Sequence, residues 1–332
     1  MAQPKYYTIW VAVYQSHNGG LSVILVENEH LSVYINERLG AEITQIEVNG
    51  NELLACYDWE SPVAVSKSST YGKQRHDWLS EYRGGWQFLM PNAGPECEVD
   101  GVNIPFHGEW SRTRVEIIAQ TESMVRVRAG TRLPMDVERE ISLLSNPYRV
   151  VITTEVRNTS TGPTSFIWGE HPAFFIKQGD KIDLPNGEVF NSAGAALGTW
   201  PVGLGSQRLD IIDDQLPHER MHFITNIEQG WAALRRSDIG IAMAWAVSDF
   251  PHVWLWQEIG SQGFPFYGRA SMIAIEPGSS FPDIGLAEAR KRGQAIELMP
   301  GQSRKTTMSL IPFPATNSPV TNVSIDGDIT LG

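Results

Sequence analysis

The stretch VVITTEVRNTSTGP at residues 150–163 decides the fold class of this chain. In its first eight residues, Val150, Ile152 and Val156 occupy alternate positions, with polar side chains among the residues between them. Because successive side chains of a strand point to opposite faces, this alternation predicts a strand with one buried face. Residues 158–163 have the composition of a turn, so the strand is predicted to end there and the chain to reverse.

The same alternation recurs along the chain, and helical periodicity is nearly absent. Further strands are predicted at residues 31–36, 43–48, 125–128, 241–247, 253–257 and 305–311. Asn49-Gly50 predicts a tight hairpin turn after the second of these. A short helix is predicted within residues 285–294. Short strands separated by Gly and Pro turns, without alternating helices, favour an all-β fold, a large antiparallel β-sandwich.

The chain of 332 residues divides into three predicted parts. Residues 1–20 are expected to form an N-terminal strand and linker, residues 21–313 the β-sandwich domain, and residues 314–332 a polar tail. This tail is either mobile or laid as a strand along a sheet edge. The apolar run at residues 6–14 is too short to span a membrane, and no small-residue cleavage site follows it. Residues 66–86 form a polar segment that predicts a long loop able to carry function.

The amino-acid composition limits the classes of binding partner that are expected for this protein. With 26 basic and 38 acidic residues the net charge is −12. No long basic run occurs, so neither a nucleic acid nor a membrane is expected as a partner. Cys56 and Cys97 lack the spacing of a zinc site and are expected as free thiols in a cytoplasmic protein. The 11 tryptophans suit a β-rich core, and some could serve as stacking platforms for sugar rings.

Two histidines and one glutamate stand beside turns and aromatic residues. His171 ends an apolar run before a proline, His107 lies in the Pro-Phe-His-Gly sequence at residues 105–108, and Glu276 ends another apolar run. An imidazole titrates near pH 6.5, so it can give and take a proton near neutrality, and a carboxylate complements it. These residues predict general acid–base chemistry on a polar substrate, with no metal and no cofactor.

In their order along the chain, these motifs resemble the aldose 1-epimerase (galactose mutarotase-like) family. The matching motifs are Pro91-Asn92, the His-Gly of residues 105–108, Asn158-Thr159-Ser160, Gly169-x-His171-Pro-x-Phe, Glu276-Pro277, Phe281-Pro282-Asp283 and the Met-Pro-Gly-Gln of residues 299–302. The resemblance extends over roughly residues 21–313. Each motif alone is weak, but the order and spacing together are specific.

The resemblance implies the supersandwich fold and an isomerase of carbohydrate metabolism that interconverts the α and β anomers of a small-molecule sugar. It implies that Glu276 is the general base for the anomeric hydroxyl and that His171 is the general acid for the ring oxygen. His107 would assist at the ring oxygen. The residues expected to bind the sugar are Asn92, which matches a family asparagine, with Arg83, Arg75, Trp254 and Gln257.

The sequence departs from the family pattern at Ala93, where members that act as mutarotases carry arginine. The sugar then loses a forked cationic donor. Either Arg75 or Arg83 replaces it, or the substrate differs. The family's sugar-binding aspartate has no clear match either, because residues 210–214 align poorly.

Other functions fit the same motifs. A carbohydrate-binding protein without catalysis on the same fold would account for Ala93. A glycoside hydrolase or lyase would need a second carboxylate near Glu276, and Glu109 and Glu170 are the candidates. The basic residues between Lys73 and Arg83 leave a phosphorylated sugar open as the substrate. His218 and His222, although four residues apart, lie in a polar stretch and predict no metal site.

Overall fold

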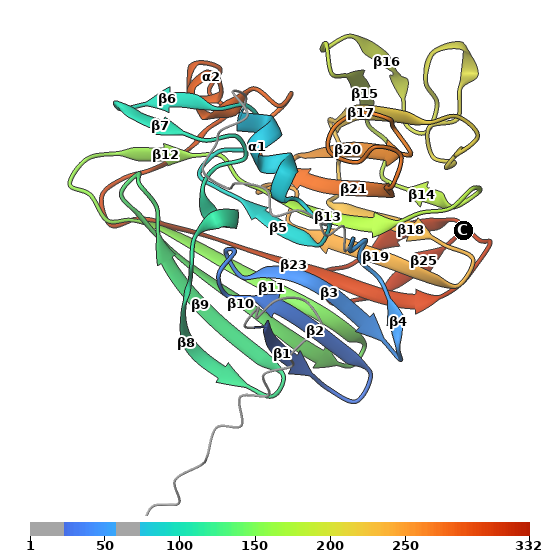
Figure 1. Ribbon diagram of the computed structural model, residues 1–332, viewed down its shortest axis with the longest axis horizontal. Helices are drawn as coiled ribbons and strands as arrows, with labels where there is room; N and C mark the ends of the chain where they lie inside the picture. Colours follow the sequence, from blue (N-terminus) through green and yellow to red (C-terminus); the bar gives the residue numbers. More distant parts are fainter. Residues whose placement is uncertain (1–22, 58–73) are drawn as a thin grey trace, which may run out of the picture.

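The computed structural model describes residues 23–57 and 74–332, which form two antiparallel β-sheets packed face to face (Figure 1). The predicted antiparallel β-sandwich is therefore confirmed. The N-terminal strand and linker predicted at residues 1–20, and the first part of the segment at residues 66–86, lie outside the described residues.

The larger sheet has 11 strands, and its central strands carry the site described below. Their order across the sheet is β1 (Val23–Glu27), β2 (Leu31–Asn36), β3 (Glu42–Val48), β5 (Trp86–Leu89), β13 (Gly169–Phe175), β21 (Ser271–Gly278), β20 (His252–Ile259), β17 (His218–Thr225), β15 (Glu188–Asn191) and β16 (Ala196–Thr199), with β4 (Asn51–Glu52) paired to β3. The predicted hairpin turn between β3 and β4 is confirmed, because Asn49 and Gly50 have φ angles of 49° and 82°.

The smaller sheet has 8 strands and contains the alternating stretch of residues 150–157. Its order is β14 (Lys181–Asp183), β18 (Trp231–Arg235), β19 (Ile239–Trp245), β23 (Ser303–Pro314), β11 (Tyr148–Asn158), β10 (Met135–Ser145), β9 (Met124–Gly130) and β8 (Glu116–Thr121). Within β11, Val150, Ile152 and Val156 are buried, and Arg157 is exposed. The period-two pattern thus reports the inner face of this sheet, as predicted.

Short elements complete the fold. The two-stranded pairs are β6 (Cys97–Val99) with β7 (Val102–Ile104), β12 (Thr164–Phe166) with β22 (Ile296–Leu298), and β24 (Val320–Val323) with β25 (Ile329–Leu331). The helices are α1 (Gln74–Glu81), α2 (Gly285–Lys291), η1 (Trp110–Arg112) and η2 (Leu204–Ser206). Helix α2 confirms the predicted helix, whereas α1 replaces part of the predicted loop. None of the helices in the described residues is long and apolar enough to cross a lipid bilayer.

A buried ion pair lies in the core between the sheets. Arg139 on β10 donates two hydrogen bonds to Glu170 on β13, at 2.6 and 2.8 Å. Trp86 on β5 donates a third to the same carboxylate at 2.7 Å. Each charge therefore has partners, which offsets the cost of taking it out of water.

The last residues of the chain pack as a hairpin on the smaller sheet, which corrects both alternatives for a tail at residues 314–332. Strands β24 and β25 pair with each other and not with a sheet edge. Val320 and Val323 are buried against Trp231 and Ala244, on the face turned away from the main core. The backbone N–H of Val320 also donates to Asp183 at 2.9 Å.

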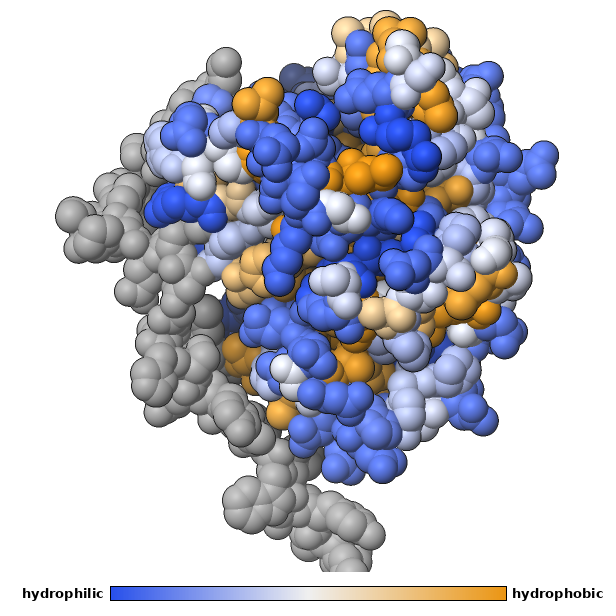
Figure 2. All heavy atoms as spheres, turned by 90° about the vertical axis from the view of Figure 1, so that its right-hand side faces the viewer, coloured by the Kyte–Doolittle hydropathy of each residue, from blue (hydrophilic) through white to orange (hydrophobic). Residues whose placement is uncertain are grey.

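The surface beyond β14 to β17 is mostly polar. Figure 2 shows this side of the molecule, where hydrophobic side chains form separate small patches among hydrophilic ones. Leu204 and Leu216, which precede β17, are 66% and 75% exposed. Scattered apolar side chains of this kind are ordinary for a protein surface.

Candidate active site

Four side chains of the candidate site come from one row of neighbours across the larger sheet. Gln87 on β5 lies opposite His171 on β13, and Glu276 on β21 lies opposite Trp254 on β20. The pairing of β13 with β21 joins the two halves, because His171 and Glu276 stand midway between the registered pairs Gly169–Gly278 and Ala173–Ala274. Directly opposite residues point to the same face, so residues far apart in sequence meet here.

His171 and Glu276 line a cavity of about 370 Å³ on this face. The Nε2 atom of His171 lies 3.6 Å from Oε1 of Glu276. Both side chains are only 3% exposed, so they lie at the buried end of the cavity. The other side chains around it include Arg75, Trp78 and Leu79 of α1, Phe106, His107, Glu219, Met221, Trp254, Trp256 and Asp283.

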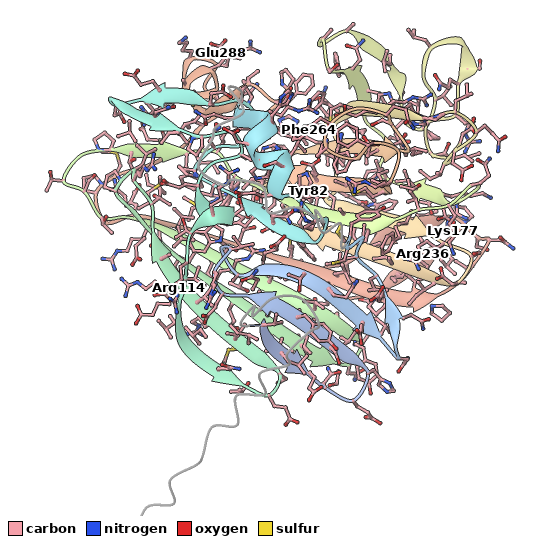
Figure 3. All side chains as sticks on the ribbon, viewed as in Figure 1. Tyr82, Arg114, Lys177, Arg236, Phe264 and Glu288 are labelled. Carbon is pink, nitrogen blue, oxygen red and sulfur yellow. The ribbon has the colours of Figure 1, made fainter. Side chains whose placement is uncertain are left out.

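Helix α1 closes the cavity with aromatic rings. The ring centroid of Trp78 is 4.8 Å from that of His107 and 5.4 Å from that of His171. Tyr82, labelled in Figure 3 beside this helix, stacks on Trp78 at 4.8 Å and lies 5.4 Å from His171. These rings shield both imidazoles from water.

The loop around His107 fixes which ring nitrogen carries the proton. His107 has a φ of 59°, and its backbone N–H donates to the carbonyl oxygen of Gly94 at 2.9 Å. In return the Gly94 N–H donates to Nδ1 of His107 at 3.0 Å. A backbone N–H can only donate, so Nδ1 accepts and a neutral ring carries its proton on Nε2. Gly108 is required beside it, since a Cβ there would lie 2.2 Å from the Met90 oxygen.

Burial shifts the proton affinities of the three predicted catalytic groups. Desolvation, and then the charge of Asp283, raise the pKa of Glu276 well above its ordinary value. Desolvation lowers the pKa of His171 to about 4. Desolvation, followed by the charges of His171 and Arg75, lowers the pKa of His107 well below its ordinary value.

These shifts reverse the proton distribution expected from ordinary pKa values. Between about pH 4 and the raised pKa of Glu276, the His171–Glu276 pair holds one proton. In the free site that proton rests on Glu276 and leaves His171 neutral, whereas the sequence suggested a carboxylate and an imidazolium. The number of protons is the same in both descriptions, and only their location differs.

Two of the five predicted sugar-binding residues, Arg75 and Trp254, line the cavity. Arg75 forms an ion pair with Glu219, and both side chains are partly exposed at the mouth. Arg83 is not among the lining residues, and its guanidinium donates to the carbonyl oxygens of Ser80 and Tyr82 at 3.0 Å. Of the two arginines predicted to replace the family arginine, Arg75 is therefore the one that lines the cavity, together with Arg220 of β17.

Asn92 is fully buried and lies outside the cavity lining, which corrects its predicted role in sugar binding. Its Nδ2 donates to the carbonyl oxygens of Pro95 at 2.8 Å and Pro105 at 3.1 Å. Its Oδ1 accepts from the N–H of Leu286 at 2.6 Å. Asn92 therefore ties the loop that carries His107 to the start of α2, and its polar atoms are already engaged.

Gln257 also lies outside the cavity lining, for a different reason. It is three residues from Trp254 on the same strand, so the two side chains point to opposite faces of the sheet. Its Oε1 lies 3.4 Å from Nε2 of His218. The prediction of both residues as sugar ligands ignored this alternation.

The carboxylates proposed as hydrolase partners are engaged elsewhere. Glu170 pairs with Arg139 on the core side of β13, and Glu109 lies 3.2 Å from Arg132. The other carboxylates in the lining are Glu219 and Asp283, and the charge of Asp283, the last residue of the Phe-Pro-Asp motif, acts on Glu276. Within the described residues, no three His, Cys, Asp or Glu side chains are grouped so as to hold a metal ion.

Several lining residues were missed from the sequence. Trp78 and Trp256 belong to the tryptophans considered as stacking platforms for sugar rings, and Asp283 ends the Phe281-Pro282-Asp283 motif, so a signal existed for these. Glu219 and Met221 on β17 had no such signal in the sequence, because their position beside the cavity depends on the pairing of β17 with β20.

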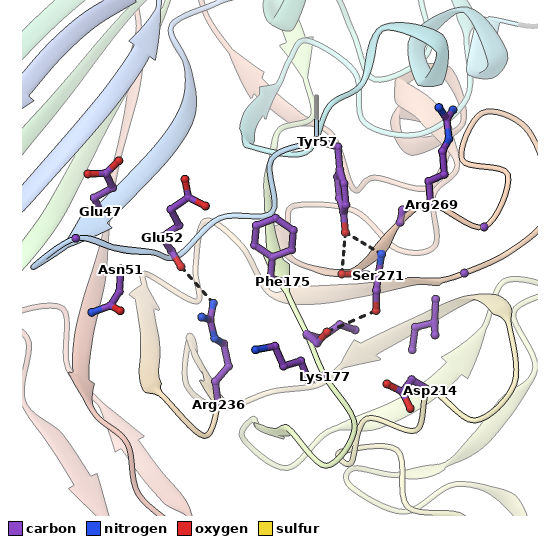
Figure 4. A pocket seen from close by; sticks show the side chains of 16 residues that line it. Glu47, Asn51, Glu52, Tyr57, Phe175, Lys177, Asp214, Arg236, Arg269 and Ser271 are labelled. Carbon is purple, nitrogen blue, oxygen red and sulfur yellow. Dashed lines mark hydrogen bonds between the residues drawn. The ribbon is translucent and has the colours of Figure 1, made fainter. Parts of the chain in front are cut away.

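A second hollow of about 870 Å³ lies at the other end of β13 and β21 (Figure 4). Tyr57 is fixed there by hydrogen bonds with the backbone oxygen and N–H of Ser271, at 2.9 and 2.8 Å. Lys177 and Arg236 are among its lining residues, and Figure 3 shows both at the side of the molecule away from α1. Its lining residues include no histidine. The smaller cavity is therefore the one that holds an acid–base pair.

Solved structures share this fold. A protein from Synechocystis sp. PCC 6803 superposes with a TM-score of 0.67 at 16% identity, covering 92% of this chain and 98% of its own. A galactose mutarotase related enzyme from Lactobacillus acidophilus superposes with a TM-score of 0.64 at 15% identity, covering 89% of this chain and 98% of its own. A galactose mutarotase-like protein from Lactobacillus casei ATCC 334 superposes with a TM-score of 0.60 at 16% identity, covering 87% of this chain and 99% of its own. No protein-family model and no curated protein matches the sequence. At these identities the likeness establishes the fold, and the chain has the β-sandwich fold of galactose mutarotase-like proteins.

Proposed function

We propose that this protein is an aldose 1-epimerase, which interconverts the α and β anomers of an aldose by opening its ring. The observation that carries the proposal is the contact of 3.6 Å between His171 and Glu276 inside a buried cavity. The fold shared with galactose mutarotase-like proteins supports the same class of reaction.

The reaction needs an acid and a base a few ångströms apart. One group takes the proton of the anomeric hydroxyl while the other protonates the ring oxygen, and both oxygens are bonded to the same carbon. After rotation about the first carbon–carbon bond, the two transfers run in reverse and close the ring as the other anomer. The pair then holds the same proton as at the start, so each turnover balances without an external proton donor.

The resemblance assigns Glu276 as the base and His171 as the acid. In the free site the shared proton rests on Glu276. An anomeric hydroxyl that donates a hydrogen bond to Glu276 favours its carboxylate form, so sugar binding moves the proton to Nε2 of His171. His171 then protonates the ring oxygen, and Glu276 takes the anomeric proton.

The surrounding groups suit the rest of a sugar ring. His107 offers an Nε2–H donor, which is suited to the ring oxygen. Trp254 and Trp256 provide apolar faces of the kind that pack on sugar C–H groups. Asp283 and the Arg75–Glu219 pair provide acceptors and donors for hydroxyl groups nearer the mouth.

Proton NMR of freshly dissolved α-anomers, with and without the protein, tests the proposal. For at least one aldose we expect a saturable acceleration of the approach to anomeric equilibrium, with no other product. Sugar binding without acceleration would contradict the proposal and indicate a carbohydrate-binding protein. New products from a panel of disaccharides would instead indicate a hydrolase or lyase. Including hexose 6-phosphates in the panel distinguishes a phosphorylated from a free sugar substrate.

A further inference from the structure

Three buried polar atoms beside His171 make no hydrogen bond of ordinary geometry within the described residues, although a contact of the His171 ring with its own backbone partly offsets the lowering of its pKa. They are Nδ1 of His171 itself, Oε1 of Gln87 and the hydroxyl of Tyr82. The three residues are 3%, 4% and 3% exposed, respectively. Buried polar groups are almost always satisfied by protein or by ordered water, so three orphans in one place point to a missing ligand.

The three side chains are neighbours. Gln87 lies directly opposite His171 in the pairing of β5 with β13, and both project from the same face. The Cβ atoms of such a pair are about 4.5–5.5 Å apart. The Tyr82 ring centroid lies 5.4 Å from that of His171. Desolvation, and then the charges of Glu276 and Glu42, raise the pKa of Tyr82 well above its ordinary value, so both carboxyl groups lie near its hydroxyl.

The orientation of the Gln87 amide is set by its own partners. Its Nε2 donates to the carbonyl oxygen of Gly84 at 2.6 Å and to the carboxylate of Glu42. Two acceptors therefore hold the amide nitrogen, and Oε1 is left as an acceptor on the other side. His171 can supply a donor at Nδ1, and the Tyr82 hydroxyl can either donate or accept. A single water molecule has the donors and acceptors to satisfy all three.

We propose that a buried water molecule binds between Gln87 Oε1, His171 Nδ1 and the Tyr82 hydroxyl, and that Gln87 acts through it as a positioning residue that keeps the proton of neutral His171 on Nδ1. The lone pair of Nε2 then faces Glu276 and can receive the shared proton. The same arrangement stabilises the imidazolium that forms when it does. A partner at the far nitrogen plays this part in other histidine-dependent sites.

The position of the His171 proton can be measured directly by ¹⁵N NMR of histidine-labelled protein. In the wild type we expect Nδ1 protonated and Nε2 unprotonated near neutral pH. Gln87→Met keeps the size of the side chain but removes the acceptor, so the ring should shift towards the Nε2-protonated form. Tyr82→Phe should cause a smaller shift in the same direction. Gln120→Met, on the exposed edge strand β8, is the matched control and should leave the spectrum unchanged.

The effect on turnover rests on the proposed function, whereas the NMR result does not. We expect Gln87→Met to lower kcat by about 10–100-fold, as for other groups that orient a catalytic histidine. KM should change by less than about twofold, because Gln87 is not among the residues that line the cavity. If no aldose equilibrates faster with the wild type, the proposed function fails while the NMR measurement still decides the inference.

Three results would overturn the inference. The first is a wild-type His171 protonated on Nε2, and the second is a Gln87→Met variant that keeps the proton on Nδ1. The third is a high-resolution crystal structure without water density at hydrogen-bond distance from all three atoms. If Gln87→Met fails to fold, Tyr82→Phe and the wild-type spectrum still test it.

Discussion

Consecutive residues of β13 take part in two buried pairs of ionisable side chains that differ in their hydrogen bonding. Glu170 faces the core and receives two hydrogen bonds from Arg139 and one from Trp86. His171 faces the cavity, and its contact with Glu276 is a single one of 3.6 Å. Its second ring nitrogen makes no hydrogen bond of ordinary geometry within the described residues.

The difference separates a structural pair from a reactive one. Three short hydrogen bonds, two of them from one guanidinium, hold the Glu170 carboxylate in a fixed position. The His171–Glu276 pair consists of two groups that both titrate, and burial pushes their pKa values in opposite directions. The first pair therefore contributes to folding, and the second is suited to moving a proton.

Glu276→Gln should give the largest effect, because it removes the group that exchanges the proton while keeping its shape. We expect anomer interconversion to fall to the spontaneous rate, with sugar binding nearly intact. Polarimetry measures the rate, and calorimetry or saturation-transfer NMR measures binding. Turnover retained at the wild-type level would show that Glu276 is not the base.

The same variant should be more stable than the wild type at alkaline pH. Because the pKa of Glu276 in the folded state is raised above its ordinary value of 4.5, the wild type loses unfolding free energy as pH rises through the raised pKa. Glutamine has no such loss. Urea unfolding at pH 4.5 and pH 8 should show a gain that is small at the lower pH and grows with pH. An equal gain at both pH values would contradict the raised pKa.

His171→Asn should lower turnover by about 10²–10⁴-fold, the usual contribution of one general acid or base. The effect is smaller than for Glu276→Gln if His107 still polarises the ring oxygen through Nε2–H. The double variant with His107→Asn measures that residual contribution. A variant of His171 alone that turns over at the wild-type rate would remove it from the mechanism.

Arg139→Met should act on folding and hardly on chemistry. It leaves the Glu170 carboxylate buried without its cation, a change that costs about 3–5 kcal/mol of unfolding free energy. Turnover per folded molecule should change by less than about tenfold, because Arg139 does not line the cavity. Urea unfolding and active-site-normalised rates measure the two effects. Arg139→Met with Glu170→Met should recover much of the stability, and failure to do so would point to a role beyond the ion pair.

A change of pH should alter kcat/KM gradually, with a smaller effect than the substitutions above. As pH falls below about 4, the pKa of His171, the pair takes up a second proton and no base remains. As pH rises above the raised pKa of Glu276, the pair loses its only proton and no acid remains. Each limb should approach a tenfold loss per pH unit once the spontaneous rate is subtracted. An acid limb near pH 6.5, the ordinary value for imidazole, would contradict the burial of His171.

The fold was predictable from the sequence because strands leave a local signature. The alternation in residues 150–157 reports one buried face regardless of the partner strand. Helix α1 left no such signature, since it buries only Trp78 and Leu79 and has no apolar stripe. The C-terminal hairpin was missed for the opposite reason, because its valines pack on a sheet face that no local pattern identifies.

The site was predictable in its residue types but not in its arrangement. His171, Glu276 and His107 stand out because each lies beside turn residues and resembles a family motif. Their meeting depends on the registers of β5, β13 and β21, which are set by contacts distant in sequence. Asn92 illustrates the limit, because only the fold reveals that its amide is already bonded to the loops it holds.

Substitutions of Trp254 and Gln257 have the smallest predicted effects. They test the same alternation of side chains between the two faces of a strand that separates Glu170 from His171 on β13. Both residues lie on β20 and were expected to bind the sugar, but their side chains point to opposite faces. Trp254→Phe, on the cavity side, should raise KM by up to about tenfold through lost ring contact. Gln257→Met should leave kcat and KM within about twofold, because methionine keeps the volume and the lost contact with His218 faces away from the cavity. A tenfold rise in KM for Gln257→Met would require the sugar to be reached from both faces of one strand. That result would contradict the row formed by Gln87, His171, Glu276 and Trp254, on which the assignment of the reactive pair depends.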